Sequence, residues 1–133
     1  MTVSDDERLS RFLFSRSWFR PDKREVKPNA FIPPPDGALS VCCTDGLEEN
    51  PVWQLGRATA TARADHPTLY GRGDFVARSA RAKNLRVERD DQPRRHATIT
   101  GWPSDGKEAI RMKAVELAAE ATLVLLPCQQ DAE

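Results

Sequence analysis

The sequence predicts an α+β fold, with a small mixed sheet of about four to five strands and about three helices. Three observations lead to this prediction. Short segments that are apolar or alternate apolar and polar residues recur between turn residues, which is typical of strands. Longer segments carry apolar residues at helical spacing, most clearly near the C-terminus. The two kinds of element occur in mixed order along the chain, which favours an α+β architecture.

The first third of the chain is expected to be mainly extended. Residues 9–14 form an apolar cluster whose aromatic content favours a strand. Residues 33–35 are three consecutive prolines followed by Asp-Gly, which predicts a stiff segment that ends in a turn. Residues 38–44 are short, apolar and bounded by turns, so we expect them to form a buried strand.

A helix is expected to begin shortly after the Asp-Gly turn at residues 45–46. Glu48 and Glu49 suit the positive end of a helix, and Pro51 is tolerated only in a first turn. The helix should end at residues 65–67, which read Asp-His-Pro. Helical spacing is carried by Val52, Leu55, Thr59 and Ala62.

A short extended segment followed by a second helix is expected in the middle of the chain. Residues 69–73 form the extended segment, and Asp74 is expected to be the N-cap of the helix. Asn84 is expected to end it in a left-handed conformation. The inward side chains of this helix would be Phe75, Val76 and Ala80.

Two alternating segments follow and predict a pair of half-buried strands. Residues 85–89 alternate apolar and charged side chains, and residues 96–101 alternate as well. In the second strand one face would carry His96, Thr98 and Thr100, with Ala97 and Ile99 on the other.

The clearest helix is expected near the C-terminus. Asp105 and Glu108, three residues apart, predict a capping pair at its start. Residues 127–133 are expected to form a polar tail. One face of the helix would carry Ile110, Ala114, Leu117, Ala118 and Ala121.

The length of 133 residues predicts one domain, residues 1–133, with frayed ends at about residues 1–8 and 127–133. The acidic start does not resemble a signal peptide, and no apolar run approaches the length of a membrane span, so we expect no membrane partner. Three cysteines without metal-ligand spacing suggest a reducing cytoplasm and no cofactor. Cys42 and Cys43 lie in the strand predicted to be buried, which argues against a thiol nucleophile.

The net charge gives no support for nucleic-acid binding over the whole surface, but one segment of the chain is locally basic. Twenty basic and twenty acidic residues cancel, so there is no global electrostatic case for nucleic-acid binding. Residues 72–96 nevertheless hold eight basic against four acidic residues, a local excess of 8 − 4 = +4. The candidate anion-binding residues there are Arg72, Arg78, Arg81, Arg94 and Arg95. The alternative is a solvated charged face with acidic neighbours. An exposed Trp102 would be an anchor for a protein partner.

His96 is the leading candidate for catalysis. It follows two arginines and could act as a general acid or base beside an anionic substrate. His66 could complete a pair that cleaves phosphodiesters, with Lys27 stabilising developing charge. The alternative for each histidine is a structural or surface role.

Taken together, the sequence favours a non-catalytic binding protein of bacterial type. Its partner would be an anionic macromolecule, either a nucleic acid or an acidic protein surface, recognised through the arginine-rich segment. One alternative is a small phosphodiesterase or nuclease that uses His96. Another is a subunit or inhibitor in a protein complex. An obligate oligomer or structural subunit would show an apolar patch around Trp18, Phe19 or Trp102 that is larger than a monomer usually exposes.

Overall fold

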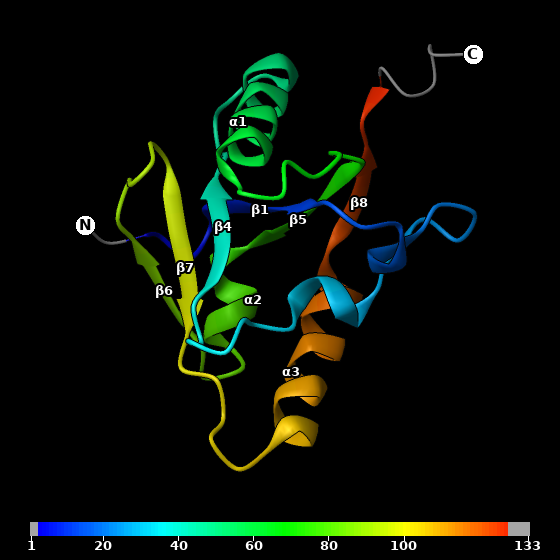
Figure 1. Ribbon diagram of the computed structural model, residues 1–133. Helices are drawn as coiled ribbons and strands as arrows, with labels where there is room; N and C mark the ends of the chain where they lie inside the picture. The colour runs from blue at the N-terminus through cyan, green and yellow to red at the C-terminus, as the bar shows by residue number, and fades with distance from the viewer. Residues whose placement is uncertain (1–2, 128–133) are drawn as a thin grey trace.

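The computed structural model describes residues 3–127 and confirms the α+β class. A six-stranded sheet has the order β6-β7-β4-β1-β5-β8, with antiparallel pairing throughout, and a small second sheet pairs β2 with β3 (Figure 1). The strands are β1 (Arg8–Leu13), β2 (Phe19–Arg20), β3 (Glu25–Val26), β4 (Leu39–Cys43), β5 (Gly71–Val76), β6 (Arg86–Arg89), β7 (His96–Thr100) and β8 (Thr122–Leu125). The helices are α1 (Glu49–Ala62), α2 (Ala77–Arg81) and α3 (Lys107–Glu120), with 3₁₀ turns at Arg16–Trp18 and Pro28–Phe31.

The two faces of the large sheet carry separate apolar clusters, because successive side chains of a strand point to opposite faces. Leu9 and Leu13 of β1 belong to the larger cluster, which also contains Leu117 of α3. Phe12 belongs to the smaller cluster, together with Trp53 of α1. Helix α1 therefore covers one face of the sheet, and α2 and α3 cover the other (Figure 1).

Helix α1 approaches the sheet closely at Gly56. A Cβ atom at this position would lie 2.8 Å from a ring carbon of Phe12 and 2.9 Å from a methyl carbon of Leu69. The glycine lowers helix propensity, but it allows the backbone of α1 to lie directly on the aromatic ring of β1. The close approach sets the distance between α1 and the sheet.

The expected N-cap role of Asp74 is wrong, because Asp74 lies inside β5. This strand pairs with β1 over its full length, from Gly71 opposite Leu13 to Val76 opposite Arg8. The sheet pairing extends the strand through residues 75 and 76, and α2 begins only at Ala77. Ala80 is buried as expected, and Asn84 has the expected left-handed backbone with φ of 65°.

The capping pair expected at Asp105 and Glu108 is also wrong. The N-cap of α3 is Gly106, and no side chain caps it. Gly106 has φ of 123°, a conformation that favours glycine, so the chain enters the helix one residue later than the capping pattern requires. The helix itself and its buried residues Ala114, Leu117 and Ala118 are confirmed.

The ends of the described chain are packed against the sheet and its helices. Strand β8, which the sequence pattern did not reveal, pairs with β5 at the sheet edge. Val3 is 3% exposed, and the carbonyls of Asp5 and Glu7 accept hydrogen bonds from the start of α2. Residues 3–8 are thus held in place, whereas residues 128–133 of the polar tail expected at 127–133 lie outside the described residues. Across residues 3–127, every helix is too short or too polar to cross a membrane.

Arg72 joins β5 to α1 from a buried position. Its side chain is 1% exposed, its Nε donates to both carboxylate oxygens of Asp74 at 3.0 Å, and its Nη2 donates to Glu49 at 3.0 Å. The guanidinium carbon lies 4.6 Å from the ring centre of Trp53. Asp74 in turn accepts a hydrogen bond of 2.6 Å from Ser10. A buried charge is tolerated only when it is paired in this way.

Replacing Arg72 with Ala is expected to lower the free energy of unfolding by about 3–5 kcal/mol, because Asp74 would lose its buried cation. Arg78→Ala is the matched control, since Arg78 is exposed and pairs with the exposed Asp6. That change should cost less than about 1 kcal/mol. Urea unfolding followed by circular dichroism measures both. Equal effects would contradict the structural role of Arg72.

Acid should weaken the Glu49–Arg72 pair in a measurable way. The hydrogen bond from Arg72 holds the pKa of the Glu49 carboxyl below its ordinary value of 4.5. A carboxyl whose pKa is lower in the folded state stabilises the fold at neutral pH and loses that contribution as the pH falls through its folded-state pKa. The stability difference between wild type and Glu49→Gln should therefore shrink below pH 4.5. In an Arg72→Ala background the pH dependence of that difference should be absent, and its persistence would contradict the pairing.

Candidate functional site

A groove of about 400 Å³ lies between α1 and the strands β1, β4 and β7. This volume falls within the range of small-molecule sites. We call it the α1 groove, and it is lined by Arg11, Phe12, Phe14, Ser40, Val41, Cys42, Leu55, Ala58, Thr59, Ala62, Arg63, Pro93, Arg94 and His96. Apolar side chains and basic side chains dominate this lining, and none of these residues is acidic.

Strand register and small helix residues create the groove. Because Ser40 pairs with Thr98 and Cys42 with His96, these side chains lie on the same face of the sheet. Above them, α1 presents Ala58 and Ala62, whose short side chains leave space that larger residues would fill. The groove therefore exists because α1 has small side chains at this turn and because alternate side chains of β4 and β7 point toward the helix.

Arg11 is a cation without an acidic partner. Its Nε donates to the carbonyl of Ala30 at 2.8 Å and its Nη1 to the carbonyl of Ser40 at 3.0 Å. Within residues 3–127 it makes no ion pair. Its guanidinium carbon lies 5.0 Å from the ring centre of Trp18. Burial, together with the charge of Arg63, lowers the pKa of Arg11 to about 10. An anion in the groove would reduce the cost of placing these two cations near each other.

Arg63 and Arg94 are the exposed cations of the groove. Arg63 lies over Phe14 at 5.2 Å and has a long contact of 3.4 Å with Asp65. Arg94 makes no hydrogen bond or ion pair with any residue in the part of the chain that the structure describes. A guanidinium without a protein partner is available to a ligand, and its planar shape suits carboxylate and phosphate.

His96 is held between two side chains from neighbouring elements. Its Nδ1 lies 2.8 Å from Oδ1 of Asp90, and its Nε2 lies 3.1 Å from Oγ of Ser40. Burial acts to raise the pKa of Asp90, but hydrogen bonds from His96 and from the backbone of Gln92 hold it below its ordinary value. Asp90 is therefore a carboxylate at neutral pH, and it fixes the orientation of the imidazole.

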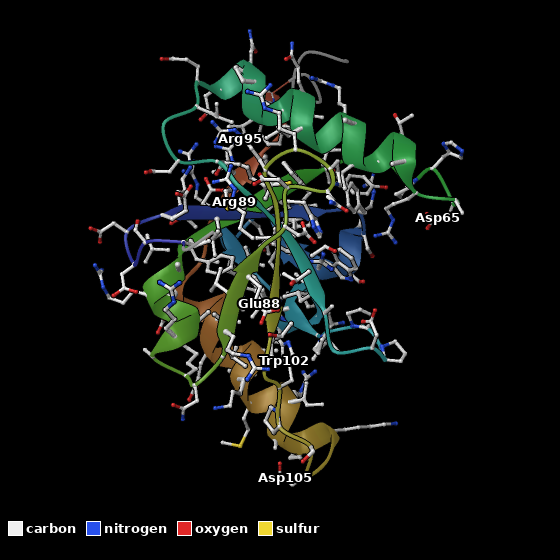
Figure 2. The ribbon with its side chains drawn as sticks, turned by 90° about the vertical axis from the view of Figure 1, so that its left-hand side faces the viewer. Asp65, Glu88, Arg89, Arg95, Trp102 and Asp105 are labelled. Atoms are coloured by element: carbon white, nitrogen blue, oxygen red, sulfur yellow. The ribbon has the colours of Figure 1, made fainter. Side chains whose placement is uncertain are left out.

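The structure does not bring the five arginines of the basic segment together. Arg72 is buried under α1, and Arg78 and Arg81 pair with Asp6 and Asp5 of the N-terminal segment. Arg95 donates to the carbonyl of Cys43 at 3.1 Å. In Figure 2 it lies toward the α1 end of the molecule, whereas Trp102 lies toward the opposite end. Arg94 alone among these five lines the α1 groove.

The three residues considered for catalysis are also separated. His96 lines the α1 groove, whereas His66 lies in the exposed turn that follows α1. Lys27 precedes the 3₁₀ turn Pro28–Phe31, which packs against α3 on the opposite face of the sheet. Neither His66 nor Lys27 lines the groove.

Sequence reasoning did not find Arg11, Arg63, Ser40 or Asp90. Arg11 and Ser40 lie in apolar segments, where a single polar residue carries no signal of function. Asp90 belongs to an acidic loop that resembles any other turn. Their proximity to His96 follows from strand pairing between distant segments, which local patterns do not encode.

The two adjacent cysteines are buried in β4, as the sequence predicted. Burial raises the pKa of the Cys42 thiol to about 11, and it also raises that of Cys43. Both thiols are therefore neutral at physiological pH, and Cys42 forms part of the groove lining as an apolar surface. Among residues 3–127, no group of His, Cys, Asp and Glu side chains is arranged to hold a metal ion.

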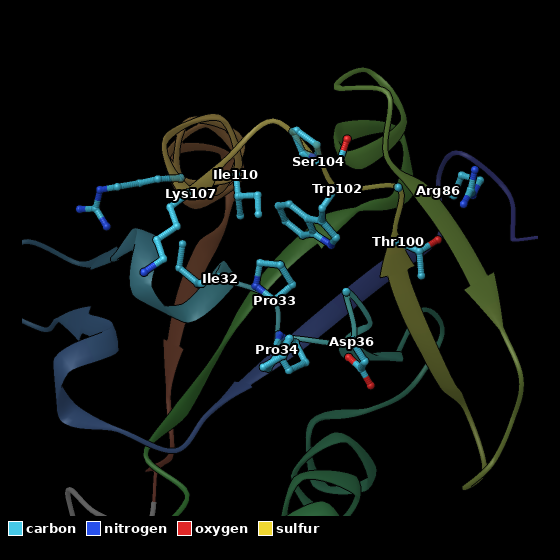
Figure 3. Close-up of a pocket in the computed structure, with 15 residues that line it drawn as sticks. Ile32, Pro33, Pro34, Asp36, Arg86, Thr100, Trp102, Ser104, Lys107 and Ile110 are labelled. Carbon is cyan, nitrogen blue, oxygen red and sulfur yellow. The ribbon is translucent and has the colours of Figure 1, made fainter.

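A second hollow of about 940 Å³ lies between the proline segment, β7 and α3. Figure 3 shows Trp102 beside Ile110 and near Pro33, with Lys107 on one side of the hollow and Arg86 on the other. The indole Nε1 of Trp102 donates to the carbonyl of Ile99 at 2.9 Å, which fixes the ring. We call this the Trp102 groove, and it is lined by residues 32–37, Arg86, residues 100–104, Lys107, Ile110 and Arg111.

Comparison of the chain with protein-family models, with curated proteins and with solved structures finds no match in any of the three. The candidate function therefore rests on the geometry and chemistry of the two grooves.

Proposed function

We propose that this protein binds a small organic anion that has an apolar body and a carboxylate or phosphate group. The observation that carries the proposal is the lining of the α1 groove, which combines aromatic and aliphatic side chains with Arg11, Arg63, Arg94 and His96 and contains no acidic residue. The apolar part of such a ligand would pack against Phe12 and the other apolar side chains. The anionic group would contact Arg94 and Arg63.

A compact ligand fits this arrangement better than an extended nucleic acid. Binding along a phosphate backbone requires several free cations in a row. Arg72 is buried, and Arg78 and Arg81 are already paired with carboxylates. Of the arginines in the basic segment, Arg94 lines the α1 groove, where it lies with Arg11 and Arg63, and this supports recognition of one anionic group there.

Octanoate is expected to bind to the α1 groove more tightly than 1-octanol, which has the same apolar chain without the charge. Arg94→Ala should weaken octanoate binding roughly fivefold, the equivalent of about 1 kcal/mol, and leave octanol unaffected. Arg86→Ala is the matched control, because Arg86 lies on the rim of the Trp102 groove. Isothermal titration calorimetry and amide chemical shifts measure affinity and location.

Two results would contradict the proposal. One is equal affinity for octanoate and octanol, because the cations would then play no part. The other is tighter binding of a single-stranded oligonucleotide than of octanoate, with an affinity that falls steeply with salt and requires Arg94 and Arg95. That result would favour the nucleic-acid partner.

A second candidate function is docking of an acidic protein segment in the Trp102 groove. Its support is the rigid indole of Trp102 in an apolar hollow, with Arg86, Lys107 and Arg111 at the rim against the single acidic residue Asp36. An aromatic anchor surrounded by charge of one sign suits an apolar segment of opposite charge. The protein would then be a subunit or inhibitor in a complex.

For this second candidate, a short peptide of Glu and Leu is expected to shift the indole N–H resonance of Trp102, which a Trp102→Phe variant assigns. Lys107→Glu combined with Arg111→Glu should abolish the shift, because the rim would then repel the peptide. Arg24→Glu, at an exposed site outside the groove, should leave it unchanged. A shift that survives the charge reversal would contradict electrostatic docking at this rim.

We also propose a cytoplasmic location. Its support is the pair of adjacent, buried cysteines Cys42 and Cys43, which are both free. Free thiols are typical of a reducing compartment.

A further inference from the structure

We propose that the α1 groove is a hydrolytic site, in which Ser40 attacks the carbonyl carbon of a small anionic ester and His96 acts as the general base. The inference rests on the proposed function, because the groove must bind the anionic part of the ester before reaction. It goes beyond binding, because it assigns a nucleophile, a base and a positioning residue.

The first support is a linear chain of hydrogen bonds from Asp90 through His96 to Ser40. Nδ1 of His96 lies 2.8 Å from Oδ1 of Asp90, and in the neutral tautomer that donates this hydrogen bond Nε2 carries the free lone pair. Nε2 then accepts the hydroxyl proton of Ser40 across 3.1 Å. A hydroxyl bonded to a base that is oriented by a carboxylate is the arrangement of an activated serine nucleophile.

The second support is that separate elements fix all three residues. Ser40 is on β4 and His96 is on β7, and the two strands pair in register beside both residues. Asp90 follows β6, and its backbone N–H donates to the carbonyl of His96 at 3.1 Å. The backbone N–H of Gln92 holds the Asp90 carboxylate at 3.1 Å. Strand pairing thus fixes Ser40 and His96, and backbone hydrogen bonds fix Asp90, which limits movement of the three residues relative to one another.

The third support is access. Ser40 is exposed, and the side chain of His96 retains 18% of its exposure while it lines the groove. Here the carbonyl group of a bound ester can reach Oγ of Ser40 from the open side of the groove.

The fourth support is positive charge beside the nucleophile. The guanidinium of Arg11 donates to the backbone carbonyl of Ser40 at 3.0 Å, so it brings positive charge to the residue that carries the nucleophile. Negative charge on the carbonyl oxygen of the ester would develop in this field, and nearby cations stabilise such charge. Arg94 and Arg63 remain to bind the carboxylate or phosphate of the substrate.

The reaction balances with water as the only co-reactant. Ser40 Oγ forms a bond to the carbonyl carbon while its proton moves to Nε2 of His96. The bond from carbon to the alcohol oxygen then breaks, and His96 gives the proton to the departing alcohol. Water attacks the acylated Ser40 in the same way, which releases the carboxylic acid and restores the Ser40 hydroxyl.

The test uses the full chain and two chromogenic esters. Mono-p-nitrophenyl glutarate carries a carboxylate, whereas p-nitrophenyl butyrate does not. We expect saturable hydrolysis of the glutarate ester by the wild type. Ser40→Ala and His96→Gln should each lower kcat by at least about a hundredfold. The glutamine in the second variant keeps hydrogen bonding but cannot serve as the base. Arg94→Ala should raise KM for the glutarate ester alone.

Asp90→Asn tests the positioning role. It should lower kcat with little change in KM, because the imidazole loses its orienting carboxylate while the binding cations remain. Glu88→Gln is the control, since Glu88 is exposed outside the groove lining. A fluorophosphonate probe and mass spectrometry should place the covalent label on Ser40.

The outcomes separate this inference from the proposed function. If octanoate binds but the Ser40→Ala variant hydrolyses the glutarate ester as fast as wild type, the hydrolytic site is wrong and the binding function stands. If both esters react at the same rate and Arg94→Ala changes neither, the anionic substrate class is wrong. Labelling at Ser40 with selectivity for the glutarate ester would support both.

Discussion

Arg72 connects the elements that define the groove. It extends from β5 under α1, where Asp74 and Glu49 pair with its charge and Trp53 lies against its guanidinium. This buried pairing fixes the N-terminal part of α1 on the sheet, and Gly56 lets the middle of the helix approach Phe12. The C-terminal part, where the side chains are small, then lies over β4 and β7 with space beneath it. The buried ion pairs of Arg72 therefore help to set the position of α1 and, with it, the position of the α1 groove.

Because some arginines are paired with carboxylates and others are not, a chain with no net charge can favour anions at one place. The arginines of α2 are paired with carboxylates of the N-terminal segment, so they contribute little free positive charge. In the α1 groove, Arg11 is held by carbonyl oxygens and Arg94 by no described residue. Burial and mutual repulsion lower the pKa of Arg11 there. A bound anion would supply the negative charge that no described carboxylate provides to Arg11 and Arg94.

Local patterns predicted the elements in which one periodicity dominates. Strands β4, β6 and β7 and helices α1 and α3 were all expected near their observed positions, because burial of one face imposes a clear period. The N-cap expected at Asp74 failed because pairing with β1 extends β5 beyond it. Strand β8 was missed because its three apolar residues, which directly follow a helix, carry no period of their own. Tertiary pairing decided both cases.

Composition and periodicity were sufficient for the α+β class, for the burial of Cys42 and Cys43 and for the face on which His96 lies. They could not reveal which arginines are free, since Arg72 and Arg94 look alike in the sequence and only packing distinguishes a buried ion pair from an open cation. They could not place Ser40 and Asp90 beside His96 either. These residues come from three segments, and the contact exists because two strand pairings hold a specific register, a property of the folded chain as a whole.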